Sequence, residues 1–162
     1  MRILGLDPGT ATTGYGIIDI VEGEPQAVAY GVIRTSSKKS TPERLQKIYD
    51  ELSELLDEYR PVAAAIEEVF FGRNITTAIS VGQARGVLIL ALAKAGIPVD
   101  EYSPPQVKDA VTGYGNADKH QVQLMVRTLL HLEETPRPDD AADGLAVAIT
   151  HYQHRRYTSL IP

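Results

Sequence analysis

The sequence predicts an α/β protein with a mixed five-stranded sheet and helices on both faces. Three observations support this fold class. Three strand-like segments joined by short turns come first, helical and strand-like segments then alternate, and helical segments fill the remainder. Such an order favours an antiparallel meander that continues into a mixed sheet. The length of 162 residues and the hydrophobic fraction of 43% suit one domain spanning residues 1–162.

The strands are predicted from short apolar runs that end at turn residues. Residues 2–7 are apolar on both faces, which indicates a central strand, and the Pro8-Gly9 turn follows them. A Gly-containing turn at 22–25 separates the next two strands. The predicted strands are 2–7, 13–20, 26–34, 62–66 and 97–102.

The helices are predicted from apolar residues at helical spacing. The first runs over 42–59, with Thr41 as its N-cap and Pro42 as its first helical residue, and ends at Arg60-Pro61. The other predicted helices are 74–95, 104–111, 118–132 and 138–156.

The 74–95 helix is apolar around almost its whole circumference, which predicts burial on nearly all sides. One sheet covers only one side of a helix. We therefore expect a twofold homodimer through the other side of this helix. The alternative is a deep core helix beneath the C-terminal helices.

The composition narrows the class of protein. The absence of cysteine excludes disulfides and thiolate metal sites. The N-terminal apolar segment is too short for a signal sequence, and the longest apolar stretch, around 87–95, is far short of a membrane span. We therefore expect a cytoplasmic protein that is not in a membrane. The net charge is −5, but residues 69–131 hold six basic and four acidic side chains, so this part is compatible with nucleic acid.

Acidic residues mark a candidate site. Asp7 and Glu67 each end an apolar strand, and Asp140 and Asp143 lie three positions apart on an otherwise apolar helix, where side chains are neighbours. Close carboxylates without basic partners favour a bound cation. Glu68 competes with Glu67, and strand alternation sends only one of the two into the site.

The donor types indicate which metal would bind. Oxygen ligands, with no cysteine and no matching histidine pair, point to Mg²⁺ or Mn²⁺ rather than zinc. A pair of such ions activates a water molecule and stabilises the leaving oxygen of a phosphodiester.

The loop after Glu67 holds Phe70, Phe71 and Arg73. Adjacent residues on a strand face opposite sides, so one phenylalanine is expected in the core and the other could stack on an unpaired base. The residues leave open which of the two does so, and two ordinary hydrophobic anchors are an equal alternative.

Five motifs occur in order from residue 1 to about 152, and together they resemble the RuvC family of bacterial Holliday-junction resolvases. The motifs are Asp7-Pro8-Gly9-Thr10 with Gly14-Tyr15-Gly16, Ala65–Phe70, Gly82–Gly86, Gln106–Lys108 and Asp140–His151.

The resemblance implies a ribonuclease-H-like, retroviral-integrase-like fold. It also implies symmetric, Mg²⁺-dependent cutting of four-way DNA junctions in recombination and repair, by a crossover junction endodeoxyribonuclease. Asp7, Glu67, Asp140 and Asp143 match the family's catalytic acids, which implies a metal site with two ions of Mg²⁺, for which Mn²⁺ substitutes. The implied DNA-binding residues are Phe70, Arg73, Lys108 and Lys119. The family also implies a homodimer through the 74–95 helix and the branch-migration partners RuvA and RuvB.

Two other functions remain as alternatives. Asp-x-Gly-Thr turns also occur in sugar kinases and actin-like ATPases, but those folds need a second such turn and a longer chain, and the sequence has no second one. A module that binds branched DNA without cutting it is the other alternative, and the presence of all four acids argues against it.

Overall fold

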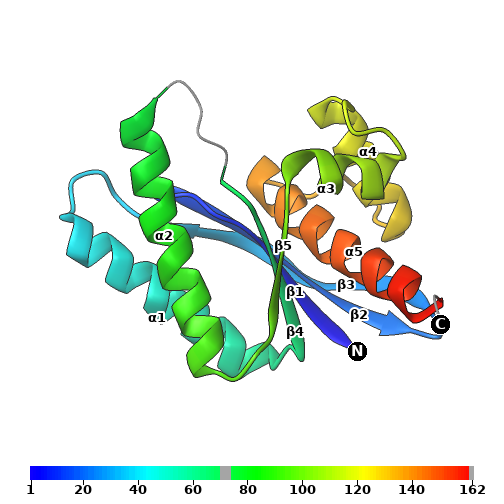
Figure 1. Cartoon of the computed structure of the whole chain (residues 1–162), viewed down its shortest axis with the longest axis horizontal. Helices are drawn as coiled ribbons and strands as arrows, with labels where there is room; N and C mark the ends of the chain where they lie inside the picture. The colour runs from blue at the N-terminus through cyan, green and yellow to red at the C-terminus, as the bar shows by residue number, and fades with distance from the viewer. Residues whose placement is uncertain (70–73, 161–162) are drawn as a thin grey trace.

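The computed structural model describes residues 1–69 and 74–160 and has a five-stranded mixed sheet in the order β3-β2-β1-β4-β5 (Figure 1). The strands β1, β2 and β3 are antiparallel neighbours, whereas β4 and β5 join parallel to β1 and to each other. The strands are Arg2–Asp7, Thr12–Val21, Glu24–Arg34, Ala63–Glu67 and Val99–Tyr102. The helices α1 to α5 are Thr41–Tyr59, Ile75–Lys94, Pro104–Thr112, Lys119–Leu129 and Asp139–Leu160.

This architecture confirms the predicted fold class, and the differences lie at the ends of elements. The last strand begins at Val99 rather than at residue 97, and α5 continues to Leu160, past the predicted end at 156. Element ends are the positions that local sequence specifies least, because capping and tertiary contacts decide them.

Ser40, not the predicted Thr41, caps α1. The Ser40 side chain accepts a hydrogen bond from the Glu43 backbone, and the Glu43 carboxylate accepts one from the Ser40 backbone at 2.8 Å. This reciprocal pair satisfies two of the amide groups that a helix start leaves without partners. Thr41 is therefore the first helical residue, and Pro42 follows it.

The sheet separates two apolar layers. Helices α1 and α2 pack on one face, through residues such as Leu52 and Leu88, and α3, α4 and α5 belong to the layer on the other face, through residues such as Val126 and Leu145. Figure 1 shows α1 and α2 on one side of the strands and α5 on the other. The acids at the ends of β1, β4 and α5 therefore meet at one end of this sandwich.

The α2 helix is buried on one side only in the single chain, and its exposed side is the one that the expected homodimer would cover. Ala84, Leu88 and Leu92 are buried, whereas Ile79 is 57% and Leu90 54% exposed. The alternative of a core helix beneath the C-terminal helices is wrong, because α5 packs on the opposite face of the sheet. A broad apolar surface is left facing solvent.

By length and composition alone, α2 is long and apolar enough to cross a membrane. This differs from the expectation that the longest apolar stretch, around residues 87–95, is too short for a membrane span. The mean hydropathy of its most apolar window is 1.5, and 28% of that window is buried. A helix packed in a globular protein passes the same test. Here Arg85 of α2 also forms an ion pair with Glu101 of β5, at 2.6 Å.

Glycines allow α5 to approach the sheet backbone to backbone. A Cβ atom on Gly14 of β2 would lie 1.8 Å from the Asp140 carbonyl oxygen, and one on Gly5 of β1 would lie 2.2 Å from the Gly144 carbonyl oxygen. On the helix side, a Cβ atom on Gly144 would lie 2.5 Å from the carbonyl carbon of Tyr15. Side chains larger than hydrogen would push α5 away from the strands that carry Asp7.

We predict that Gly14→Ala lowers the free energy of unfolding by at least about 2 kcal/mol, because its methyl group has only rigid backbone to displace. Chemical denaturation followed by circular dichroism measures the loss. The matched control is Gly115→Ala, whose Cβ atom would meet Pro105 at an ordinary contact distance of 3.6 Å. Equal stability of the two variants would contradict the close-approach argument.

Candidate metal centre

The sheet places Asp7 and Glu67 side by side. Strands β1 and β4 are parallel neighbours, with Leu6 opposite Ile66, and the two acids are the last residues of their strands. Carboxyl ends of parallel strands meet at the same edge of a sheet, where functional groups commonly gather. The adjacency that the sequence analysis required for these two acids is therefore present.

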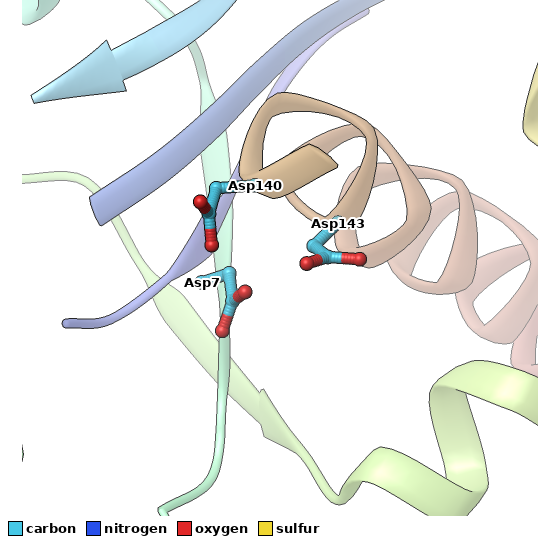
Figure 2. A group of neighbouring side chains, drawn as sticks. All are labelled: Asp7, Asp140 and Asp143. Carbon is cyan, nitrogen blue, oxygen red and sulfur yellow. The ribbon is translucent and has the colours of Figure 1, made fainter. Parts of the chain in front are cut away.

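Helix α5 brings the other two acids to the same edge. Asp140 and Asp143 lie in its first turns, and the close packing of Gly14 against Asp140 fixes the start of the helix over β2. Asp7, Asp140 and Asp143 each offer an oxygen atom, and these oxygens lie within 4.8 Å of one another. Figure 2 shows the three carboxylates gathered at the end of the helix and strand.

Glu67 lies beside this group rather than inside it. Its side chain lines a cavity of about 250 Å³ together with Asp7 and Asp143, but its oxygens are not among those within 4.8 Å of one another. Glu68 is exposed and lines only the neighbouring depression among the cavities described. The structure thus brings Glu67, and not Glu68, to the cavity that Asp7 and Asp143 line.

The acids strongly disfavour one another's ionisation. Burial, reinforced by the negative charges of Glu67 and Asp143, raises the pKa of Asp7 to about 8. Burial also raises the pKa of Glu67 to about 7, with a further contribution from Asp143. The pKa of Asp143 is raised by burial too, against the opposing charge of Lys119. At neutral pH the cluster therefore retains protons that isolated carboxylates would lose.

Two lysines complete the cavity wall. Lys108 comes from α3 and Lys119 from the first turn of α4, which Asp118 caps. The Lys119 ammonium lies 3.4 Å from a carboxylate oxygen of Asp143. Burial lowers the pKa of Lys119, but the charge and hydrogen bond of Asp143, together with the charges of Asp139 and Asp140, outweigh this effect and the net pKa is raised. Lys119 therefore keeps its positive charge at the mouth of the site.

The arrangement fits a hard divalent cation. Asp7, Asp140 and Asp143 offer only oxygen donors, which Mg²⁺ and Mn²⁺ prefer. Lys119 is the one cation of the described residues within ion-pair distance of any of these acids, so the cluster has an excess of negative charge. Phe70 and Arg73, the other predicted site residues, lie outside the described residues.

Sequence reasoning missed the glycines that position the acids. Gly5, Gly14, Gly16 and Gly144 were available in the sequence, three of them within the quoted motifs, but their role depends on where α5 crosses the sheet. Their signal was the occurrence of glycine inside strands and inside a helix, where it is normally unfavourable.

Solved structures of known proteins share this fold. The structure of Thermus thermophilus RuvC has a TM-score of 0.91 and 39% identity, with 98% of this chain and 97% of that chain covered. The structure titled as Thermus thermophilus RuvC in complex with Holliday junction substrate has a TM-score of 0.89 at 37% identity, covering 97% and 96% of the two chains. The predicted ribonuclease-H-like fold is thus confirmed.

Sequence comparisons agree along almost the whole chain. The RuvC protein of Syntrophomonas wolfei is 55% identical, covering 99% of this chain and 94% of the relative. That of Heliobacterium modesticaldum is 58% identical, covering 92% of each. The family model described as crossover junction endodeoxyribonuclease RuvC matches residues 3–151. This chain therefore belongs to the RuvC family.

Proposed function

We propose that this chain is a metal-dependent endonuclease that resolves four-way DNA junctions in recombination and repair. The convergence of three aspartate oxygens within 4.8 Å is the observation that carries the proposal. The relatives are named crossover junction endodeoxyribonucleases, and one solved relative is in complex with a Holliday junction substrate. Both facts support the same reaction on the same fold.

Asp7, Glu67, Asp140 and Asp143 are the proposed ligands of two Mg²⁺ ions, for which Mn²⁺ substitutes. When bound, the metal supplies a Lewis acid that polarises the phosphodiester and lowers the pKa of the attacking water. The acids hold this centre rigidly, because three of them start from β1 and the first turns of α5. Without metal their charges would repel a DNA phosphate.

The basic residues bind the DNA. Lys108 and Lys119 line the same cavity as Asp7, Glu67 and Asp143, which supports a contact of both lysines with the DNA backbone at the scissile phosphate. A lysine ammonium stabilises the negative charge that builds up on phosphoryl oxygens during hydrolysis. From the family resemblance, Phe70 stacks on a base near the crossover and Arg73 contacts the DNA backbone.

A homodimer through α2 would present two such sites to the two like-polarity strands of a junction. The exposed apolar residues Ile75, Ile79 and Leu90 all belong to this helix, which supports the pairing. The proposed setting is the bacterial cytoplasm, with one nuclease domain per chain and with RuvA and RuvB as partners.

We predict that Asp7→Asn lowers the rate of junction cleavage in Mg²⁺ by about a thousandfold or more, while the junction Kd changes little. The amide removes an anionic ligand without removing any group that contacts the DNA. Cleavage and gel-shift assays on a synthetic four-way junction measure the two effects. Glu68→Gln, a neutralisation of the exposed neighbouring acid, is the control and should cut normally. Wild-type cutting rates in Asp7→Asn would remove Asp7 from the site.

We predict that the metal-free protein becomes less stable as pH rises from about 5 to about 8. The pKa values of about 8 for Asp7 and about 7 for Glu67 exceed their ordinary values, so the folded state holds protons that the unfolded state has lost. The stabilisation is complete below about pH 4 and disappears as pH passes the folded-state values.

Denaturation at several pH values measures this loss, on the order of 1–2 kcal/mol. Mg²⁺ should reverse it at pH 8, because metal binds the folded state. Asp7→Asn should flatten the pH dependence of stability, whereas Asp50→Asn, at an exposed position of α1, should leave it unchanged. A slope of the opposite sign in the wild type would show that the acids do not lie close together.

We predict that Ile79→Lys weakens self-association by about a hundredfold or more, because it buries an unpaired charge in the proposed interface. Analytical ultracentrifugation measures the dimer dissociation constant. Leu124→Lys on α4 is the control, since Leu124 is 48% exposed on a different helix. The control should keep the wild-type constant, and a monomeric wild type would refute the dimer.

A further inference from the structure

A second depression lies next to the one that Asp7 and Glu67 line and extends toward α1. It has a volume of about 490 Å³ and shares Thr77 and Val81 with a depression of about 510 Å³ that reaches Asp7 and Glu67. The lining residues of the second depression are Gly9, Thr10, Ala11, Thr12, Arg44, Thr76, Thr77, Ser80 and Val81. The lining thus combines one guanidinium with several hydroxyl groups and contains no carboxylate.

Arg44 of α1 is held in place by hydroxyl groups rather than by an acid. Its Nε donates a hydrogen bond to Thr35 Oγ1 at 2.8 Å, and the Thr35 hydroxyl donates in turn to the Thr10 carbonyl. No described carboxylate lies within ion-pair distance of Arg44, and the neighbouring Glu43 is bound to Ser40. A fixed guanidinium with its terminal nitrogens available is suited to a phosphate.

The hydroxyl groups around Arg44 come from separate elements that are tied together. Thr10 Oγ1, in the turn after β1, shares a hydrogen bond of 2.5 Å with Ser80 Oγ of α2. Thr76 and Thr77 lie in the first turn of α2, where the Thr77 amide already donates to the Asn74 side chain at 3.3 Å, so this turn adds hydroxyl groups to the depression. Hydroxyl donors beside a guanidinium match the oxygens of a phosphodiester.

We propose that Arg44 and this depression bind a backbone phosphate of the junction DNA beyond the phosphate that is cut. The subsite would fix the path of the DNA strand that runs from the acids toward α1. It would lie on the opposite side of the acids from Lys108 and Lys119. The inference rests on the proposed nuclease function and adds a binding residue to it. Arg44 takes no part in the chemical step.

Charge neutralisation tests the contact. Arg44→Gln keeps a donor for Thr35 but removes the charge, so the junction Kd without divalent metal should rise about fivefold to tenfold. The dependence of log K on log salt should also become shallower by about 0.9, as expected for one lost phosphate contact. Arg44→Lys should retain most of the affinity. Lys47→Ala on the same helix is the control, because Lys47 pairs with Glu51 and lines none of these depressions, and it should bind as the wild type does.

A methylphosphonate scan of the junction identifies the phosphate. We expect one backbone position whose neutralisation weakens binding to the wild type but has no effect on Arg44→Gln. Equal sensitivity of both proteins at every position would overturn the proposal and leave Arg44 with a structural role. An unchanged salt slope accompanied by a lower Tm would do the same.

The proposed function is judged separately, in the wild type alone. If the wild type cuts the junction in Mg²⁺ while Arg44→Gln and the wild type respond alike in the scan, the subsite fails and the nuclease assignment stands. If the wild type neither binds nor cuts the junction, the nuclease assignment itself fails.

Discussion

The close backbone contact between α5 and the central strands is the constraint on which the rest of the molecule depends. Gly5 and Gly14 on the sheet and Gly144 on the helix leave no room for a Cβ atom between the two elements. Because the contact involves backbone rather than flexible side chains, the helix has one depth and one position over the sheet. That position carries Asp140 and Asp143 to the end of β1, beside Asp7.

Packing energy therefore assembles a group of charges that would otherwise separate. The apolar layer under α5, with Leu145 and Val147 fully buried, is large compared with the repulsion among a few partly solvated carboxylates. Burial, together with this repulsion, leads the acids to retain protons, as the raised pKa values of Asp7 and Glu67 indicate. A site that is strained when empty of cations gains stability when cations bind.

The sheet also separates the chemistry from the proposed assembly surface. Helices α3, α4 and α5 cover one face and supply Asp143 and both lysines of the cavity, whereas α1 and α2 cover the other. The depression at Arg44 lies where the α1–α2 layer meets the end of β1. It adjoins the depression that Asp7 and Glu67 line, so the proposed phosphate subsite and the acids lie along one continuous surface.

The sequence by itself determined the elements and their order and singled out the candidate acids, because periodicity and strand-ending carboxylates are local properties. Strand alternation also favoured a single glutamate, and Glu67 is the one that lines the cavity with Asp7 and Asp143. Tertiary structure alone decided that Ser40 caps α1, that one side of α2 stays exposed, and that Arg44 lines a depression at the end of the sheet. Tertiary structure also decided that Gly5, Gly14 and Gly144 lie where α5 approaches the sheet. Each of these features depends on which distant segments come into contact, and a local sequence pattern does not specify those contacts.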